Sequence, residues 1–326
     1  MTDLNLVVAR AETITPGVRQ LTLVPRDPAA RLLSYPPGSH LGLRWRPGRV
    51  NCYSLTGDGR SPVTYTVSVL RVASSRGGSE WVHQLEPGDE VTAVPPRSTF
   101  APVATGRNHL LVAGGIGITP LLSHARWHLR WGSQFRLYYV HKPGRAAHLD
   151  EVTRIGDEDR GDGEQVTGAG GRRAWAFGNR GDFWSCLGPA LGRQPLGTYL
   201  YVCGPLGMID AVTGAARTLG WPRSRIRVEA FGAADEGPRD SFTVTLAQSG
   251  RRVNVGAGET LLEALERSGA GVDSMCRQGV CGECRTPLAR GRADHRDLVL
   301  TPGERDDWIM PCVSRAADDD GLELRL

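Results

Sequence analysis

Four cysteines near the end of the sequence constrain the fold more strongly than any other feature. Cys276, Cys281 and Cys284 follow the spacing C-x4-C-x2-C, and Cys312 lies further along the chain. Two irons bridged by two sulfides need four thiolates that converge from one tight loop and one distant segment, and this spacing is that of plant-type [2Fe–2S] sites. The pattern therefore predicts that the four cysteines hold a [2Fe–2S] cluster.

A tetrahedral zinc site and reduced structural thiols are the alternatives. Structural zinc usually takes two C-x2-C pairs, whereas the first interval here is four residues and Cys312 is isolated. Gly279 and Gly282 lie inside the loop, where small residues let backbone amides approach the sulfurs. These features favour iron and sulfide over zinc. Cys52 and Cys186 lie outside the pattern, and we expect them to be ordinary packed or surface thiols.

The composition is typical of a water-soluble protein of two or three domains. The chain has 326 residues, 40% of them hydrophobic and 23% charged, and no apolar run is long enough to cross a bilayer. The first residues lack the features of a secretory signal, so we expect a cytoplasmic protein with no membrane partner. The odd number of cysteines, seven, argues against a disulfide framework. A net charge of +4, without basic stretches interleaved with aromatics, argues against nucleic-acid binding.

Residues 1–103 have the pattern of a small antiparallel β-barrel or sandwich. Short runs of alternating apolar residues are separated by turns rich in Pro and Gly. Only Ser79–Leu85 looks helical. The predicted strands are Val18–Leu23, Leu41–Trp45, Thr64–Leu70 and Glu90–Val94.

Residues 104–232 predict an α/β domain, because apolar strands alternate with helical stretches, as in a parallel sheet. Gly156–Gly181 is rich in Gly, Asp and Arg and has no apolar periodicity, so we expect a mobile surface insertion there. The predicted strands are Leu110–Ala113, Phe135–Val140, Tyr199–Val202 and Ile226–Val228, and the predicted helices are Pro120–Leu129 and Met208–Leu219.

A polar linker, residues 233–240, then precedes a small C-terminal domain, residues 241–326. This domain opens with a hairpin pattern whose turn falls at Ser249-Gly250. A short helix, Thr260–Arg267, follows and is stopped by Gly269.

A glycine-rich turn joins the first predicted strand and helix of the α/β domain. Gly114, Gly115 and Gly117 allow close backbone approach, Thr119 can cap the helix, and Pro120 suits its first turn. Free amides and the positive end of the helix dipole then face an anion, most simply a pyrophosphate. Alone, such a turn is weak evidence for a dinucleotide.

Two later strand ends strengthen this interpretation, because ligands bind at the carboxyl ends of parallel strands. Cys203, Gly204 and Pro205 end one strand, and Glu229 ends the last, shortly before Phe231. From the residues alone, Cys203 could equally be a buried thiol and Phe231 a core side chain.

In this order the motifs resemble the phthalate dioxygenase reductase family, NADH-dependent flavin reductases with a C-terminal plant-type ferredoxin domain. The resemblance rests on the cysteine pattern, on GGIGITP at 114–120, on CGP at 203–205 and on the segments 295–300 and 310–315. It covers the chain apart from the expected insertion. It implies a multidomain protein with an antiparallel β-barrel flavin domain, an α/β parallel-sheet nucleotide domain and an α+β, β-grasp ferredoxin domain.

The resemblance also implies the flavin site. The family's Arg-x-Tyr-Ser strand matches Asn51, Tyr53 and Ser54, so Tyr53 would flank the isoalloxazine ring and the Ser54 hydroxyl would hydrogen-bond near N5. Three residues that open the barrel's helix would offer amides to the flavin phosphate: Gly77, Gly78 and Ser79.

For the nicotinamide, the resemblance places Cys203 near the hydride-donating carbon, with Glu229 close by. Phe231 would cover the flavin where the nicotinamide must enter. With Ser54, these are the residues implied for hydride transfer.

Asn51 departs from the family, which usually has arginine against the phosphate. The lost charge-assisted contact is worth about 1.5–3 kcal/mol, unless Arg49 or Arg71 replaces it; Arg76 could also help. We expect FMN rather than FAD, because the Gly-Gly-Ser turn fits a single phosphate.

The nucleotide itself is less constrained. A carboxylate on the ribose hydroxyls normally marks NAD, and an arginine can accommodate the NADP phosphate. The second predicted strand ends in the residues 140–145, which contain Lys142 and Arg145 but no acid. The family favours NADH, which we expect, while these residues permit NADPH.

The implied function is electron transfer from the nucleotide through the flavin and the cluster to an oxygenase. A Rieske-type ring-hydroxylating or demethylating enzyme is the leading acceptor, and a haem monooxygenase is the alternative. A redox sensor or scaffold without turnover is the alternative of another class. The acidic residues 306–307 and 318–320 are either a solvated face or a docking patch for a basic acceptor. We expect a monomer.

Overall fold

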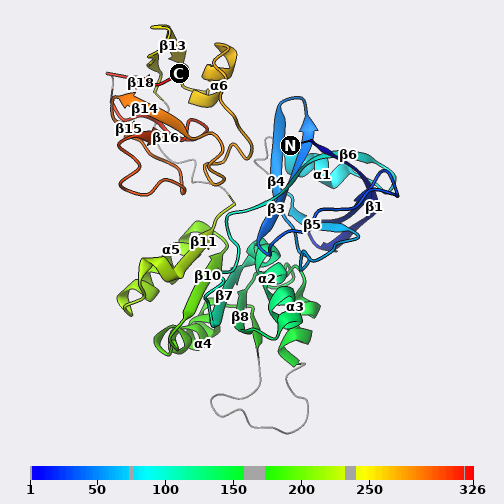
Figure 1. Cartoon of the computed structure of the whole chain (residues 1–326). Helices are drawn as coiled ribbons and strands as arrows, with labels where there is room; N and C mark the ends of the chain where they lie inside the picture. The colour runs from blue at the N-terminus through cyan, green and yellow to red at the C-terminus, as the bar shows by residue number, and fades with distance from the viewer. Residues whose placement is uncertain (1, 73–76, 158–172, 232–239, 319) are drawn as a thin grey trace. The chain divides into compact units, whose positions relative to one another are not determined.

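The computed structural model describes residues 2–72, 77–157, 173–231, 240–318 and 320–326. The chain forms two compact units, Met1–Glu229 and Ala230–Leu326 (Figure 1). Among the described residues, no helix has the length and apolar character needed to span a membrane.

The first sheet is the predicted antiparallel barrel. Its six strands are arranged in the order β4-β3-β6-β1-β2-β5, and a bridge between Leu55 and Val67 joins the two edge strands. One helix, α1 (Gly78–Gln84), accompanies the barrel, close to the prediction of Ser79–Leu85. The strands are β1 (Leu4–Thr15), β2 (Val18–Pro25), β3 (Ser39–Arg46), β4 (Arg49–Ser54), β5 (Tyr65–Leu70) and β6 (Glu90–Ser98).

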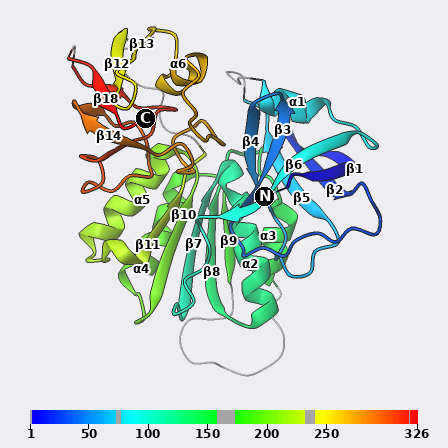
Figure 2. The ribbon, with the colours of Figure 1, turned by 45° about the horizontal axis from the view of Figure 1, so that its top comes forward.

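The second sheet of this unit is parallel throughout, as the alternation of strands and helices predicts (Figure 2). Its strand order is β11-β10-β7-β8-β9. The strands are β7 (Asn108–Gly114), β8 (Gln134–Val140), β9 (Ala174–Phe177), β10 (Thr198–Cys203) and β11 (Ile226–Glu229). The helices are α2 (Ile118–Trp131), α3 (Leu149–Asp157), α4 (Arg180–Gly192) and α5 (Leu206–Thr218), with 3-10 turns at Gly115–Gly117 and Arg223–Arg225.

The interpretation of Gly156–Gly181 as one surface insertion is wrong for its second part. Ala174–Phe177 form β9, which pairs with β8, and α4 begins at Arg180. The strand has only four residues, of which Ala174 and Phe177 are buried, so its periodicity is too short to stand out in the sequence. Residues 158–172 lie outside the described residues.

The second unit contains a five-stranded mixed sheet in the order β13-β12-β18-β14-β16. The hairpin of β12 and β13 turns at Gly250, as predicted. Thr260 caps α6 (Leu261–Arg267) and exchanges hydrogen bonds with Glu263 in a capping box. The strands are β12 (Phe242–Leu246), β13 (Arg252–Val255), β14 (Thr286–Arg290), β16 (Trp308–Ile309) and β18 (Leu322–Leu324), with a separate pair β15 (Ala293–Asp294) and β17 (Arg315–Ala316).

Candidate cofactor sites

The glycine-rich turn after β7 packs against the turn after β10. The two strands are parallel neighbours, and Ala113 pairs with Cys203 at their carboxyl ends. A Cβ on Gly117 would lie 2.3 Å from the Cys203 carbonyl oxygen, and one on Gly204 would lie 3.0 Å from the Gly114 Cα. No side chain fits between these backbones, so the glycines at 114, 117 and 204 fix the contact of the two turns.

Gly115 differs from its neighbours because its surroundings are open. Its φ is +55°, and a Cβ built on it meets nothing within 4 Å. The 3-10 turn Gly115–Gly117 leads directly into α2, and the Ile118 amide donates to the Gly115 carbonyl. An anion at this helix start would meet no side chain at Gly115, and we call this turn the phosphate cradle.

Thr119 does not cap the helix, contrary to the prediction. The N-cap is Gly117, and the Thr119 hydroxyl donates instead to the Ile116 carbonyl at 3.1 Å. The reason is the 3-10 turn, which brings the chain into helical geometry early and places Thr119 inside the first helical turn. Pro120 lies in that turn, as predicted.

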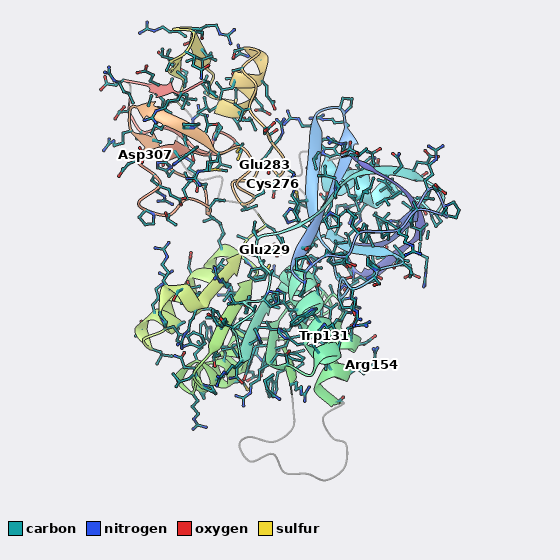
Figure 3. All side chains as sticks on the ribbon, in the orientation of Figure 1. Trp131, Arg154, Glu229, Cys276, Glu283 and Asp307 are labelled. Atoms are coloured by element: carbon teal, nitrogen blue, oxygen red, sulfur yellow. The ribbon has the colours of Figure 1, made fainter. Side chains whose placement is uncertain are left out.

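Cys203 and Glu229 pair across the carboxyl ends of β10 and β11, and Glu229 is labelled in Figure 3. Burial raises the pKa of the Glu229 carboxyl to about 8, and its Oε2 has no hydrogen-bond partner among the described residues. Burial, together with the Glu229 charge, also raises the pKa of the Cys203 thiol. We call these two side chains, at the ends of β10 and β11, the nicotinamide corner. Near neutral pH this corner presents an uncharged thiol beside a protonated carboxyl.

Two further predicted residues flank this corner in the sequence. Pro205 is the N-cap of α5, and its carbonyl accepts from the Met208 amide at 2.9 Å. Phe231 follows β11 and belongs to the second compact unit, where 39% of its surface is exposed.

In the barrel, Asn51 is held in place by its own strand and hairpin. Its Oδ1 accepts from the Trp45 indole at 3.2 Å, and its Nδ2 donates to the Tyr53 hydroxyl at 3.4 Å. A Cβ on Gly78 would lie 2.1 Å from the Asn51 Nδ2. The Asn51 amide thus covers the first residue of α1, and burial raises the pKa of Tyr53 to about 12.

The other candidates for a flavin phosphate contact are distributed around α1. Gly77 is its N-cap, with a φ of +111°, and the Ser79 hydroxyl accepts from the Val72 amide at 3.3 Å. The Ser79 side chain therefore holds the backbone of Val72, while its amide belongs to the helix start. Arg71 is exposed, and Arg76 lies outside the described residues.

His40 is a residue that the sequence reasoning missed. It lies directly opposite Ser54 in the β3–β4 register, so the two side chains share one face of the barrel wall. Both are buried, and the His40 Nε2 has no partner within the described part of the chain. Burial lowers the pKa of His40 to about 4. Only the strand register reveals this pairing, and a single sequence does not contain it.

The four motif cysteines of the second unit converge as two pairs. The thiols of Cys276 and Cys281 are within hydrogen-bonding reach of each other, and so are those of Cys284 and Cys312. A two-iron cluster takes two thiolates on each iron, so this arrangement fits it. Within the described ranges no three His, Cys, Asp or Glu side chains surround a single metal ion, which is the arrangement that a structural zinc would need.

Backbone amides favour the thiolate form in the loop that carries Cys276, labelled in Figure 3. The Gln278 amide donates to the Cys276 sulfur at 3.3 Å. The hydrogen bond from Cys281, together with nearby amides that include this one, lowers the pKa of Cys276 to about 6. The hydrogen bond from Cys312 likewise lowers the pKa of Cys284. The same two hydrogen bonds raise the pKa of the partner thiols, Cys281 and Cys312, so each pair shares a proton.

The segment 297–300 is hydrogen-bonded to this cysteine loop. The buried Asp297 carboxylate accepts from the amides of Val299 and Leu300 at 3.0 and 2.7 Å, and the Leu298 amide donates to the Gly279 carbonyl at 3.0 Å. Gly279 has a φ of +71°, and a Cβ there would lie 2.7 Å from the Val313 side chain. Only glycine fits, which explains its place in the motif.

Cys52 is half-buried on β4 and Cys186 is exposed on α4, and neither forms a disulfide with a described residue. Of the acidic residues, Asp306, Asp307 and Asp320 are exposed, while Asp318 pairs with Arg292 at 3.4 Å.

Comparisons with known proteins identify the family of the chain. Residues 89–226 match the family model of the dimethylamine monooxygenase subunit DmmA-like N-terminal domain, and residues 244–317 match the 2Fe-2S iron-sulfur cluster binding domain. The beta subunit of a heme-dependent oxidative N-demethylase of Ectopseudomonas mendocina is 38% identical over 96% of both chains. A phthalate dioxygenase reductase of Burkholderia cepacia is 36% identical, over 96% of this chain and 94% of the relative.

Solved structures give the same result for the fold. A phthalate dioxygenase reductase, described as a modular structure for electron transfer from pyridine nucleotides to [2Fe-2S], has a TM-score of 0.74 and 34% identity over 99% of this chain and 98% of that one. An intact type IV self-sufficient cytochrome P450 monooxygenase has a TM-score of 0.75 and 31% identity, over 99% of this chain and 41% of the longer protein. By its sequence, its fold and its paired cysteines, the chain belongs to the phthalate dioxygenase reductase family.

Proposed function

We propose that this chain is the reductase component of an oxygenase, passing electrons from NAD(P)H through FMN and a [2Fe–2S] cluster to the oxygenase. The observation that carries the proposal is the pairing of Cys276 with Cys281 and of Cys284 with Cys312, in a chain that also has a phosphate cradle at Gly115. Relatives along nearly the full length are reductase subunits by name, which supports it.

The cofactors supply the chemistry: when bound, a flavin takes up two electrons together as hydride and passes them singly to the cluster. The protein positions them. We assign the amides around Gly115 to the nucleotide pyrophosphate, and Cys203 and the protonated Glu229 to the nicotinamide. An uncharged corner there accepts the nicotinamide ring without desolvating a charge.

On the barrel, we assign Tyr53 to one face of the flavin ring and Ser54 to its N5 edge. Asn51 replaces the family's arginine at the phosphate, where its amide already lies against Gly78. The amides of Gly77, Gly78 and Ser79 would then carry the phosphate contact.

The acceptor is an oxygenase, and one observation bears on which kind. A Rieske-type enzyme remains the acceptor that the family resemblance suggests. However, the matched DmmA-like model and the 38% identical demethylase subunit, which is named as heme-dependent, favour a haem-containing oxygenase that removes N-alkyl groups. We also propose that the protein is a monomer. We further propose that it is cytoplasmic, since an odd number of cysteines suits a reducing compartment.

A visible spectrum of anaerobically purified protein tests the proposal. Flavin and [2Fe–2S] bands that both bleach on addition of stoichiometric NADH or NADPH are expected, and chromatography of the released flavin distinguishes FMN from FAD. An iron–sulfur spectrum without flavin, unmoved by either nucleotide, would refute the proposed electron path.

The Cys281→Ser variant tests the order of electron transfer. It should abolish cytochrome c reduction while sparing flavin reduction, because one iron loses a thiolate ligand. Cys186→Ser, at an exposed thiol on α4, is the matched control and should behave as the parent protein. Full cytochrome c reduction by Cys281→Ser would mean that electrons leave before the cluster.

A further inference from the structure

The carboxyl ends of β8 and β9 carry three exposed cationic side chains. Lys142 and Arg145 lie on one turn directly after β8, closed by a hydrogen bond of 3.0 Å from the Arg145 amide to the Lys142 carbonyl. Arg180 is the first residue of α4, just after β9. The sequence reasoning missed Arg180 because it fell within the expected insertion.

These side chains come from one edge of the sheet, the same edge as the phosphate cradle. Gly114 pairs with Val140 across β7 and β8, and Val140 pairs with Phe177 across β8 and β9. The His141 amide continues the ladder to the Phe177 carbonyl at 3.0 Å. Figure 2 shows β7, β8 and β9 side by side. The cations therefore lie one and two strands beyond the glycine turn, on the side away from β10.

Among the described residues, no carboxylate neutralises them. None of the three forms an ion pair with a described residue, and the residues from His141 to Leu149 include no acid. The acid nearest to Arg180 in the sequence, Asp182, accepts from the Asn179 side chain at 2.6 Å as part of the helix cap. In the described part of the chain, this edge therefore presents positive charge without the free carboxylate that would accept hydrogen bonds from ribose hydroxyls.

The strand order fixes which end of a dinucleotide meets these cations. The nicotinamide corner lies on β10 and β11 and the phosphate cradle on β7, so the adenosine must extend over β8 and β9. Neighbouring strands are about 4.8 Å apart, and the five strands therefore span about 19 Å, which suits an extended dinucleotide.

We propose that the adenosine end of this site binds a 2′-phosphate through Lys142, Arg145 and Arg180, so that the electron donor is NADPH rather than the NADH that the family resemblance favours. This rests on the proposed function in one respect, namely that the nucleotide at this edge is the donor. Two arginines can bind a phosphate through several charge-assisted hydrogen bonds each, which a ribose hydroxyl does not offer.

Binding of nucleotide fragments to the full chain with its cofactors tests the assignment without turnover. In calorimetric titrations, 2′,5′-ADP should bind at least about tenfold more tightly than 5′-AMP, which lacks only the 2′-phosphate. The triple variant Lys142→Ala, Arg145→Ala, Arg180→Ala should lose that preference. Arg154→Ala, at an exposed arginine on α3 labelled in Figure 3, is the matched control and should keep it. Equal binding of the two fragments, binding of neither, or a preference that survives the triple variant would overturn the proposal.

Lys142 offers an independent measurement because it is the only lysine in the chain. An amine-selective reagent followed by peptide mass spectrometry reports on its side chain, and 2′,5′-ADP should protect it while 5′-AMP does not. Labelling that neither fragment changes would remove Lys142 from the site.

Cytochrome c reduction separates this proposal from the broader one. A higher kcat/KM with NADPH than with NADH is expected, with the ratio reduced in the triple variant. Turnover that prefers NADH would refute the 2′-phosphate site and leave the reductase function standing. Absence of turnover with either nucleotide would refute the reductase function itself.

Discussion

The substitution Gly115→Ala tests whether the open turn after β7 holds the nucleotide phosphate. The φ of Gly115 is +55°, and an added Cβ meets nothing within 4 Å of the protein. The methyl group therefore costs only the backbone strain of a left-handed alanine, about 1–2 kcal/mol. It would occupy space from which the amides reach a phosphate, so we expect it to affect binding more than folding.

Gly132→Ala provides the matched control. Gly132 ends α2 with a φ of +63°, and its Cβ would also meet nothing within 4 Å. The two variants should therefore lose nearly the same free energy of unfolding. They differ only in which end of α2 carries the methyl group, and only Gly115 borders the proposed phosphate.

Two measurements on the same preparations decide the matter. Denaturant unfolding should give losses of about 1–2 kcal/mol for both variants. Calorimetry with NADPH should show at least tenfold weaker binding for Gly115→Ala, because loss of one charge-assisted hydrogen bond is worth about 1.5–3 kcal/mol, and unchanged binding for Gly132→Ala. Equal affinities in the two variants would refute the phosphate cradle.

The remaining predictions concern groups whose environment is unusual. Phe231→Ala should change the rate of flavin reduction in stopped-flow experiments, and an unchanged rate would remove Phe231 from the nicotinamide path. Burial raises the pKa of Glu229 from 4.5 to about 8, so the folded chain holds a proton there that the unfolded chain has released, and the free energy of unfolding should fall as pH rises from 4.5 to 8. In the Glu229→Gln variant, the urea midpoint of unfolding should decline less over this pH range than in the parent protein. The same pH profile in both proteins would count against the raised pKa. Burial lowers the pKa of His109 from 6.5 to about 4, so the unfolded state binds the proton first and stability should fall as pH drops below 6.5. His109→Leu should relieve that loss, by up to about 3 kcal/mol at pH 4, and a variant equally sensitive to acid would contradict this.

The sequence predicts the elements whose signals are local. The hairpin at Ser249-Gly250 and the capped helix after Thr260 form as predicted, because turn and cap preferences act over a few residues. The helix after the glycine turn was placed at Pro120–Leu129 and extends over Ile118–Trp131. Boundaries shift in this way because backbone geometry, such as the 3-10 turn, decides where a helix starts.

The elements that were missed depend on the rest of the molecule. β9 is a strand because β8 offers it a hydrogen-bonding edge and the core accepts Ala174, and four residues of sequence do not reveal that edge. The error had a functional consequence. By assigning these residues to an insertion, the sequence reasoning also removed Arg180 from the nucleotide edge.

For the site residues, too, local patterns are predicted from the sequence and contacts between distant segments are not. The cysteine spacing predicts its own ligand set because the cluster loop is nearly contiguous, and the chemistry of iron dictates the intervals. The contact of Asn51 with Gly78, and that of Gly117 with Cys203, join segments far apart in the chain. Such contacts need strand order and register, which a single sequence does not specify.

Asn51 and the proposed 2′-phosphate site both concern anion recognition in the first unit. In the barrel, the uncharged Asn51 stands where the family usually has arginine. Its side-chain amide accepts a hydrogen bond from Trp45 and lies against the start of α1. After β8 and β9, the side chains of Lys142, Arg145 and Arg180 are exposed and form no ion pair with a described residue. A flavin monophosphate held mainly by backbone amides keeps its contacts whatever cation is nearby, since amides are already oriented by the helix start. The proposed 2′-phosphate lies beyond the glycine turn and would therefore depend on side-chain charge. The difference predicts that rising salt should weaken 2′,5′-ADP binding steeply and flavin retention only slightly. Equal salt dependence of the two would mean that both phosphates are held in the same way, and that the reasoning from Asn51 and Arg180 is wrong.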